Sequence, residues 1–302
     1  MRATTLFEVI IIGGSYAGLS AAMTLGRSLR NTLVIDSGKP CNQQTPHSHN
    51  FLTQDGKPPE EIVTVARKQV EQYEKVQFLN DKVISGNRVG QLFTLETSSG
   101  KTFSAKKLIF ATGIKDTMPP VKGFSACWGI TAIHCPYCHG FEFRGKKTAI
   151  MANGDGAFHV ASLVSNLTKN ITLLTSGKAN FSEEQMHKFH RNNIRIEEAE
   201  IAELEHTKGY LNQVVFKDGK KIKFAALYAN IPFEQHSNVP AKMGCRLTEM
   251  GYIEVDNAQK TSVEGIFACG DNTTYFRSIA NAVSNGNIAG ATVNYQLVEA
   301  AF

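Results

Sequence analysis

The chain has 302 residues, a formal net charge of +5 and 42% apolar residues. A chain of this length and ordinary composition is long for one hydrophobic core and suits two domains. No apolar run approaches the roughly 20 residues that span a bilayer, no basic block indicates nucleic acid, and the N-terminus lacks a signal-peptide pattern. We therefore expect a cytoplasmic protein with no membrane or nucleic-acid partner, whose six cysteines are mostly free thiols.

The first predicted element is a β-branched strand over residues 7–12, which leads into the glycine-rich turn GGSYAG and a helix. This unit directs a helix N-terminus at a phosphate. A second strand ends in Asp36, about twenty residues on, where a carboxylate binds a ribose without a 2′-phosphate, as in FAD or NAD. Ser15 replaces the middle glycine of G-x-G-x-x-G. A strand–helix turn without a ligand is the alternative.

Residues 39–55 are irregular and predict a loop of the kind that covers a cofactor. A helical pattern follows over residues 59–74. Residues 83–110 predict a small β-meander with a turn at 98–100, and the meander closes on a buried strand that runs into Ala111, Thr112 and Gly113.

The next feature is the pair Cys135 and Cys138, spaced C-x-x-C. Two thiols at this spacing can close into a disulfide or open to a dithiol, and so store two electrons. A cysteine at the first turn of a helix is acidified by backbone N–H groups and by the helix dipole, which favours the nucleophilic thiolate. His139 follows directly and is placed to move the proton that thiol–disulfide exchange requires.

Three alternatives to redox chemistry remain for this pair. A structural zinc site needs four ligands, usually from two such pairs, whereas the other cysteines are scattered singly at Cys41, Cys127, Cys245 and Cys269. The spacing C-x-x-C-H is also the attachment pattern of c-type haem, which normally belongs to exported proteins. The third alternative is two buried thiols without chemistry.

Residues 146–178 predict a second strand–turn–helix unit, with ANGDGA at its turn. Ala152 replaces the first glycine of the fingerprint. The following strand, residues 171–174, ends in TSGK and offers neither an acid for a ribose diol nor an arginine for a 2′-phosphate. We predict a nucleotide-binding fold whose ligand chemistry is eroded.

The last third of the chain predicts short strands over residues 194–228, with a hairpin turn at Asp218 and Gly219. Residues 232–240 predict a polar linker. A buried strand over 265–268 precedes Gly270 and Asp271, and small residues then dominate a helix over 278–293, as close packing against a cofactor would need.

Taken together, the order of these pieces resembles the low-molecular-weight thioredoxin reductase family, flavoproteins of the pyridine nucleotide–disulfide type. The likeness implies an α/β fold of two Rossmann-like three-layer nucleotide-binding domains, the second inserted into the first. An FAD-binding domain would comprise residues 1–114 plus 235–302. An NAD(P)-binding-like domain over 115–234 would carry the C-x-x-C pair.

The resemblance also implies the roles of particular residues. Cys138 would face the flavin, Cys135 would attack the partner's sulfur, and His139 would act in place of the family's usual acidic proton donor. The residues expected to contact FAD surround the glycine turn and the ends of neighbouring strands. They are Gly13, Gly14, Ser15, Ala17, Gly18, Asp36, Ser37, Lys39, Asn42, His49, Val83, Ala111, Thr112, Gly113, Gly270, Asp271, Ser278 and Ile279.

Two departures from the family pattern favour an oxidase over a reductase. Ser176 and Gly177 stand where the reductases carry a pair of arginines for NADPH, and Ser278 replaces a glutamine near the flavin. The sequence is in this respect similar to the branch that includes the gliotoxin- and holomycin-type dithiol oxidases. We expect an FAD-dependent thiol–disulfide oxidoreductase that uses NADPH poorly and oxidises dithiols with oxygen.

Other functions and partners stay open at this point. The chain is alternatively a thioredoxin reductase fed by ferredoxin or by an unconventionally bound NAD(P)H, or a flavin redox sensor without turnover. The expected substrate is a thioredoxin-like protein or a small dithiol. The likeness further implies a homodimer, and no metal is expected.

Overall fold

The computed structural model describes residues 5–302 and divides the chain into two compact units. The first unit contains the residues up to Gln43, Glu60–Lys115 and Phe233–Phe302. The second unit contains Gln44–Pro59 and Asp116–Pro232. This division differs from the expected one mainly in Gln44–Pro59, which the sequence assigned to the first domain.

The first unit is built on a seven-stranded sheet in the order β3-β2-β1-β6-β5-β4, with β17 also paired to β6. Its members are β1 (Thr5–Ile12), β2 (Thr32–Asp36), β3 (Val76–Asn80), β4 (Val83–Val89), β5 (Leu92–Thr97), β6 (Thr102–Phe110) and β17 (Ile266–Ala268). Strands β3, β2, β1, β6 and β17 run parallel, and the meander β4-β5-β6 is antiparallel. The sequence predicted this core because β1, β2 and β6 contain continuous apolar runs, which are typical of strands covered on both faces.

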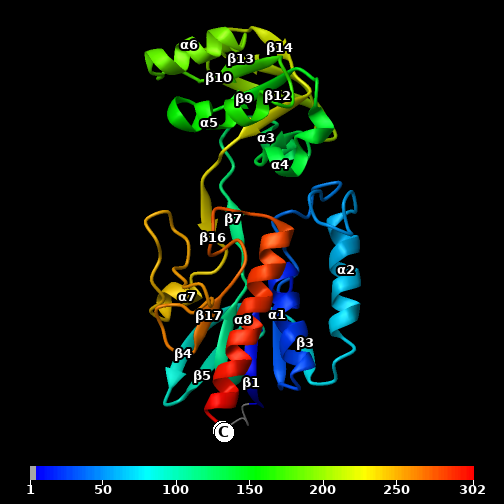
Figure 1. Cartoon of the computed structure of the whole chain (residues 1–302), viewed down its shortest axis with the longest axis vertical. Helices are drawn as coiled ribbons and strands as arrows, with labels where there is room; N and C mark the ends of the chain where they lie inside the picture. Colours follow the sequence, from blue (N-terminus) through cyan, green and yellow to red (C-terminus); the bar gives the residue numbers. More distant parts are fainter. Residues whose placement is uncertain (1–4) are drawn as a thin grey trace. The chain divides into compact units, whose positions relative to one another are not determined.

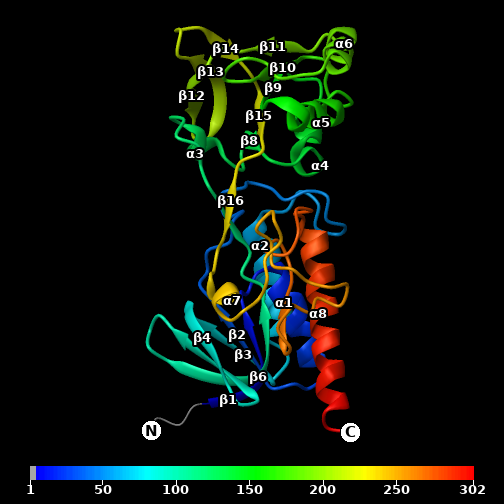
Figure 2. The ribbon, with the colours of Figure 1, turned by 90° about the vertical axis from the view of Figure 1, so that its left-hand side faces the viewer.

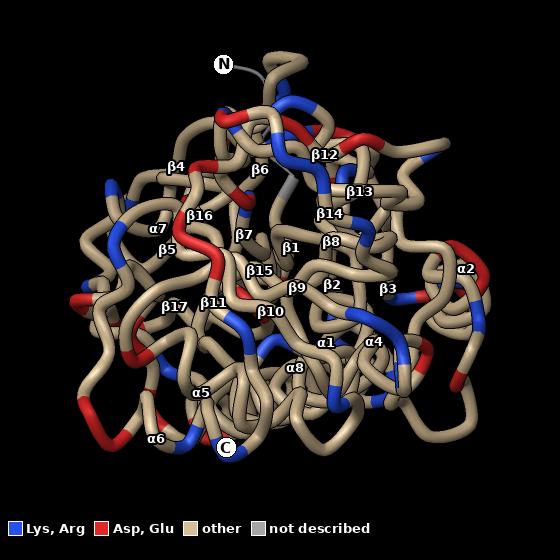
Figure 3. The backbone as a smooth tube through the Cα atoms, turned by 90° about the horizontal axis from the view of Figure 1, so that it is seen from above, with Lys and Arg blue, Asp and Glu red and all other residues tan. Residues whose placement is uncertain are grey.

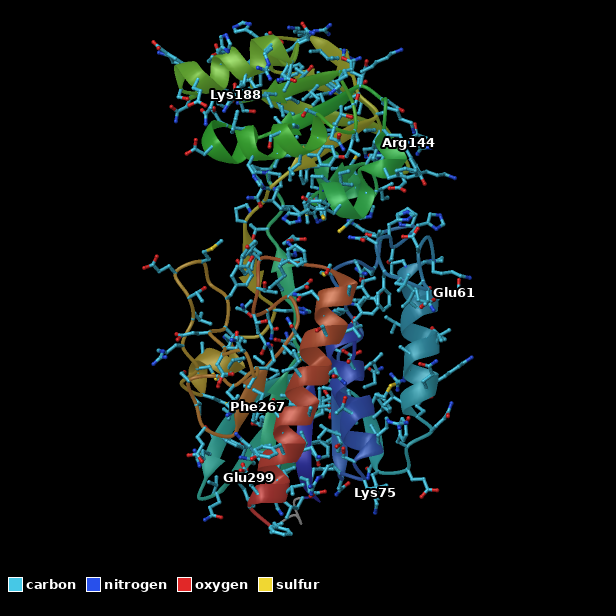
Figure 4. All side chains as sticks on the ribbon, in the orientation of Figure 1. Glu61, Lys75, Arg144, Lys188, Phe267 and Glu299 are labelled. Atoms are coloured by element: carbon cyan, nitrogen blue, oxygen red, sulfur yellow. The ribbon has the colours of Figure 1, made fainter. Side chains whose placement is uncertain are left out.

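The helices of the first unit are α1 (Tyr16–Arg27), α2 (Pro59–Val70), α7 (Val239–Lys242) and α8 (Ile279–Glu299). Helices α1 and α8 lie side by side (Figures 1 and 2), and the Ser20 hydroxyl on α1 donates to the Val283 carbonyl on α8. Small residues make this close approach possible, because a Cβ on Gly286 would lie 2.1 Å from the Ala17 carbonyl oxygen. Phe267 of β17, labelled in Figure 4, is fully buried in this unit.

The second unit contains a parallel five-stranded sheet and a smaller antiparallel sheet. The parallel sheet has the order β11-β10-β9-β15-β8 and consists of β8 (Ala132–Ile133), β9 (Thr148–Met151), β10 (Ile171–Leu174), β11 (Arg195–Glu197) and β15 (Ala226–Ala229). The antiparallel sheet comprises β12 (Ile201–Thr207), β13 (Tyr210–Phe216) and β14 (Lys221–Lys223). The helices are α3 (Phe124–Cys127), α4 (Pro136–His139), α5 (Gly154–Val164), α6 (Glu183–Arg191) and the 3₁₀ turn η1 (Phe141–Phe143).

Residues 232–240, predicted as a polar linker without regular structure, contain a strand and the start of a helix. Residues Phe233–Gln235 form strand β16, which pairs with β7 (Ile114–Asp116) where the chain passes between the units. Helix α7 begins at Val239, which is 2% exposed. Because this stretch is polar in composition, the sequence did not predict the paired strand β16 or the burial of Val239.

Lysine and arginine are interspersed with aspartate and glutamate in short runs along the chain (Figure 3). Within residues 5–302, no helix combines the length and the apolar character that a membrane span requires.

Candidate functional site

In the first unit, the glycine turn between β1 and α1 is the point where several predicted stretches meet. Gly13 has a φ of +108°, and a Cβ there would lie 2.1 Å from the Ala111 carbonyl oxygen. A Cβ on Gly14 would lie 2.9 Å from the Cβ of Asp36, and one on Gly18 would lie 1.9 Å from the Gly13 oxygen. The turn is therefore in direct contact with the ends of β2 and β6.

The Gly270–Asp271 turn after β17 reaches the same place. A Cβ on Gly270 would lie 2.9 Å from the Cβ of Ala17, in the first turn of α1. Asp271 Oδ2 lies 3.9 Å from Nε of Arg277. Asn272 is fully buried, and its Oδ1 finds no hydrogen-bond partner in the described part of the chain. Three stretches far apart in sequence, the ends of β2 and β6 and the Gly270–Asp271 turn, thus converge on the glycine turn at the N-terminus of α1.

The N-terminus of α1 fits the pyrophosphate of a dinucleotide. Its N-cap, Ser15, makes no side-chain capping hydrogen bond, and no acidic residue lies in the first turn. The first backbone N–H groups of a helix have no partner within the helix, and the positive end of the helix dipole favours an anion. Asp36 lies at the end of β2 beside Gly14, as a ribose-binding carboxylate requires. The donor set at this end of the sheet fits FAD.

The other residues expected at the cofactor lie at different distances from this turn. Asn42 Nδ2 donates to the Tyr16 hydroxyl at 3.4 Å, which places it at the start of α1. Val83 is a buried core residue at the start of β4. Ser278 is the N-cap of α8 and Ile279 its first residue. The remaining members, Ser37, Lys39, Thr112 and Gly113, are partly or fully exposed in the segments after β2 and β6.

In the second unit, the two cysteines lie at a short helix, as the C-x-x-C spacing predicted. Cys135 is the N-cap of α4, and its Sγ lies 2.8 Å from Sγ of Cys138. The helix ends at Gly140, its C-cap. A Cβ added at Gly140 would lie 2.3 Å from the Pro136 carbonyl oxygen. Helix α4 has only one turn, and Pro136 at its first position has no N–H to offer. The helix dipole therefore supports a thiolate less than expected, and neighbouring side chains matter more.

His139, directly after the pair, lies beside groups from two other segments, Gln44–Pro59 and η1. Its ring meets the His49 ring edge to face, with centroids 6.3 Å apart. Nε2 of His49 lies 3.7 Å from Oε1 of Glu142 in η1. Nε2 of His139 and Oε2 of Glu142 are buried and find no hydrogen-bond partner among residues 5–302. Arg144, which follows η1 and is labelled in Figure 4, stacks over the Phe141 ring at 4.0 Å.

Burial is the main influence on the acidity of this cluster. It lowers the pKa of His139, and His49 lowers it further, while Glu142 and a hydrogen bond with the His47 backbone raise it. Burial, and then the nearby Cys135 and Glu142, raise the pKa of the Tyr228 phenol above its usual value. A neutral imidazole is a base, so His139 is suited to take a proton from a thiol.

The remaining cysteines contrast with this pair. Cys127, Cys245 and Cys269 are buried, and burial raises the pKa of each thiol, that of Cys269 to about 12. Such thiols stay protonated and unreactive. Cys41 is exposed. Within residues 5–302, no three His, Cys, Asp or Glu side chains are grouped so as to hold a metal ion.

The second nucleotide-type turn is closed by the chain itself. Asn153, the N-cap of α5, accepts hydrogen bonds from the N–H groups of Gly154 and Asn180 and donates to the Lys178 carbonyl. The loop after β10 is thereby tied to the α5 N-terminus. The donors that would bind a pyrophosphate in an open turn are partly used within the protein.

The loop after β10, residues 175–182, contains no arginine, and Lys178 is its one basic residue. The loop after β10 is bound instead to Glu198, whose Oε1 accepts from the Ala179 N–H and whose carbonyl accepts from the Gly177 N–H. Arg195 lies opposite Thr172 near the start of the parallel strand β10, at the other end of the sheet. A carboxylate at the loop is the opposite of what a 2′-phosphate requires.

Sequence reasoning missed part of the arrangement around His139. Glu142 lies three residues after His139, a helical spacing that identifies it as a neighbour. His49 was expected at the cofactor, and the structure places it in the second unit against His139. No local pattern links two residues 90 positions apart. Asn153 was also overlooked as a cap, although asparagine is a preferred N-cap residue.

Comparison with known proteins shows a match along nearly the whole chain. The family model described as pyridine nucleotide-disulphide oxidoreductase matches residues 7–286. Thioredoxin reductase tcpT of Claviceps purpurea (strain 20.1) is 31% identical over 309 residues, covering 99% of this chain and 96% of that protein. Thioredoxin reductase sirT of Leptosphaeria maculans is 31% identical over 318 residues, covering 98% and 96%. The solved structure of an oxidoreductase from Agrobacterium tumefaciens has a TM-score of 0.92 at 35% identity and covers 98% of this chain and 99% of its own.

Proposed function

Because the chain belongs to the pyridine nucleotide-disulphide oxidoreductase family, as an FAD-binding, thioredoxin reductase-like enzyme acting on sulfur groups, we propose that it oxidises dithiols through Cys135 and Cys138. Oxygen is the final electron acceptor in this proposal, and NADPH is a poor donor. The supporting observation is a contrast between two helix N-termini. That of α1 has no side-chain cap, whereas Asn153 caps α5 and binds the adjacent loop.

Without the two arginines of the family pattern, NADPH should bind much more weakly than it binds to the reductases. A charge-assisted hydrogen bond contributes about 1.5–3 kcal/mol. Two such bonds to a 2′-phosphate, which Ser176 and Gly177 cannot make as arginines would, correspond to about two to four orders of magnitude in affinity. Glu198 adds a like charge beside the same loop. These terms together make NADPH an inefficient reductant.

The first unit would hold FAD at the N-terminus of α1. Backbone N–H groups of the turn from Gly13 to Gly18 would bind the pyrophosphate, Asp36 the ribose, and Asp271 the ribityl–phosphate part. The other expected contact residues that belong to the first unit would line the rest of the cofactor. Bound FAD supplies the acceptor for the two electrons that leave the cysteine pair.

The chemistry of the pair follows from thiol–disulfide exchange. A substrate sulfur attacks Sγ of Cys135 in the oxidised pair, the Sγ–Sγ bond breaks, and Cys138 leaves as a thiolate. The second substrate sulfur then attacks the first, which releases Cys135 and closes the substrate disulfide. Two substrate S–H bonds are lost and one S–S bond forms, while the cysteine pair takes up two electrons. His139 accepts and returns the protons of these steps.

Anaerobic mixing of the flavin-loaded protein with three electron donors tests this function. We expect a small dithiol to bleach the flavin absorbance and air to restore it, while NADPH and NADH bleach it slowly or not at all. Fast bleaching by NADPH would make the protein an ordinary reductase. If no donor bleaches the flavin, the protein is a redox sensor without turnover.

A cysteine variant tests the route of the electrons. Cys138→Ser should abolish dithiol-driven bleaching, because the pair can no longer form its disulfide. Cys41→Ser is the matched control, since Cys41 is an exposed cysteine outside the pair, and it should bleach like the unaltered protein. Persistent bleaching in Cys138→Ser would remove the disulfide from the mechanism.

We propose, from the family likeness, that the protein acts as a homodimer in the cytoplasm on a thioredoxin-like protein or a small dithiol. Light scattering of the flavin-loaded protein measures the mass of the assembly. A mass of one chain at all concentrations used for turnover would contradict the dimer.

A further inference from the structure

A row of two histidines and two carboxylates lies beside the cysteine pair in the second unit. His139 ends α4, and Glu142 follows one turn later in η1. His49 and Asp55 come from Gln44–Pro59, the segment that the structure assigns to this unit. The proposed exchange steps give no role to Glu142, His49 or Asp55, and of these three only His49 was named earlier, as an expected contact of the cofactor.

The observed contacts connect His139 with an exposed side chain through His49. His49 lies between the two carboxylates, because its Nε2 is 3.7 Å from Oε1 of Glu142 and its Nδ1 is 3.7 Å from Oδ2 of Asp55. The ring of His49 also meets the ring of His139 edge to face. The row ends at the Asp55 side chain, which is 67% exposed. Every member from Glu142 to Asp55 thus has a proton acceptor as its neighbour.

Thiol oxidation requires a route by which protons leave the cysteine pair for solvent. Each substrate molecule loses two protons along with its electron pair, and His139 is the base beside the sulfurs. Its Nε2 is buried without a hydrogen-bond partner in the part of the chain that the structure describes. A buried base must pass its proton on before the next cycle. An imidazole such as that of His49 suits this transfer, because one nitrogen accepts a proton while the other releases one.

Building on the proposed function, we infer that Glu142, His49 and Asp55 form a proton path between His139 and solvent. His49 is in addition a positioning residue, which sets how readily His139 holds a proton. The 3.7 Å separations are longer than hydrogen bonds, and a small side-chain rotation or one bridging water closes each of them. The path lies entirely within one unit.

The acidity of the groups around His139 supports this path. His49 lowers the pKa of His139 and Glu142 raises it, so the two neighbours act in opposite directions. The phenol of Tyr228 on β15 has a pKa raised by burial, Cys135 and Glu142, and it stays protonated. His47 contributes through its backbone. Two further titratable side chains of Gln44–Pro59 lie against His49, namely Asp55 and the His47 ring, whose centroid is 6.5 Å from that of His49.

The test is the pH profile of anaerobic flavin reduction by a small dithiol. Neutral His139 is the active form, so the rate falls on the acid side as His139 becomes protonated. His49→Gln removes an influence that lowers the pKa of His139, and the acid limb should move to higher pH. Glu142→Gln removes an influence that raises it, and the limb should move to lower pH. We compare rates at one pH on the acid limb, each divided by the plateau rate of the same variant. This relative rate should fall roughly threefold to tenfold in His49→Gln and rise by a similar factor in Glu142→Gln.

His47→Gln is the matched control from the same segment. The His47 ring is exposed, its Nδ1 lies 3.0 Å from the Gly56 carbonyl oxygen, and its centroid lies 6.5 Å from that of the His49 ring. Its contact with His139 is made by the backbone, which the substitution keeps. Its acid limb should coincide with that of the unaltered protein. If His49 and Glu142 only supported the structure, the plateau rate of both variants would fall. Their acid limbs would then stay at the same pH.

The outcomes separate this inference from the proposed function. If dithiol reduces the unaltered protein but the limbs of His49→Gln and Glu142→Gln coincide with it, the path is wrong and the function stands. If dithiol does not reduce the unaltered protein, the proposed function fails. NMR titration of ¹³C-labelled histidines, with His139 assigned by His139→Gln, then still tests the cluster without substrate. Shifts of the His139 titration in opposite directions support it, and no shift overturns it.

Discussion

Gly18 and Gly156 lie at the two nucleotide-type turns, and their surroundings predict opposite effects of the same substitution. A Cβ on Gly18 would lie 1.9 Å from the Gly13 carbonyl oxygen, whereas one on Gly156 would meet no atom within 4 Å. Gly18→Ala should therefore push α1 away from the turn and destabilise the first unit by about 3 kcal/mol. We expect flavin release at a temperature several degrees lower, measured by flavin fluorescence.

Gly156→Ala serves as the control for this prediction. Alanine favours the helical state over glycine by up to about 1 kcal/mol, and the open space at Gly156 allows that gain. Flavin release should be unchanged, because Gly156 belongs to the second unit. Equal flavin release in Gly18→Ala and the unaltered protein would contradict the close packing at the first turn.

At the residue scale, the sequence predicted those site residues whose neighbours are fixed by a local pattern. Asp36 follows a strand at the spacing of a ribose-binding acid, and the structure places it beside Gly14. Cys135 and Cys138 are fixed by one helical turn. His49 could not be located in this way, because its contact with His139 depends on how a loop folds over a distant segment.

At the scale of elements, the α5 N-terminus can be reopened toward a nucleotide. In Asn153→Gly with Ser176→Arg, the cap that binds Lys178 and Asn180 is lost and a cation is added to the loop. Ser176 has a φ of +47°, which a non-glycine residue already adopts there. One arginine–phosphate bond of about 1.5–3 kcal/mol should raise NADPH-driven flavin reduction at low NADPH by roughly tenfold to a hundredfold.

NADH provides the internal control for that double variant. It has no 2′-phosphate, so Ser176→Arg should increase the rate with NADPH more than the rate with NADH. Equal increases with both nucleotides would show that opening the cap matters and the cation does not. No increase with either would contradict the closed turn as the reason for poor use of NADPH.

The elements differ in how far the sequence predicted them. The parallel strands β1, β2, β6, β9 and β10 were predicted because their apolar runs are continuous and buried. Helix α6 was missed, since Phe189 is its one buried residue and its other side chains are mostly polar or charged. The capping box of Ser182 and Gln185 was the available sign of its start. β16 was missed because its pairing partner, β7, lies far away in sequence.

At the scale of the whole molecule, each unit has its own hydrophobic core. The core of the first unit gathers residues such as Leu95 and Phe110, and those of the second gather Trp128 on one side of its sheet and Phe189 on the other. Trp128 is the single tryptophan of the chain. It stacks on Phe124 with ring centroids 5.5 Å apart, so its fluorescence reports the second unit. Flavin fluorescence reports the first unit, because the proposed FAD site lies there.

Separate cores predict that the two signals respond to different substitutions. Phe189 is 2% exposed and packs against the rings of Phe158 and Phe181, so Phe189→Ala should cost about 3–5 kcal/mol in the second unit. The tryptophan transition should then fall by several degrees while flavin release stays unchanged. Leu95→Ala, in the first unit, should cost about 2–5 kcal/mol and give the reverse result. Thermal scans that follow both signals measure this. If each substitution shifted both transitions equally, the two units would unfold as one cooperative body. Saturating FAD would then raise the temperature of both transitions. If the cores are separate, FAD binding stabilises the first unit alone.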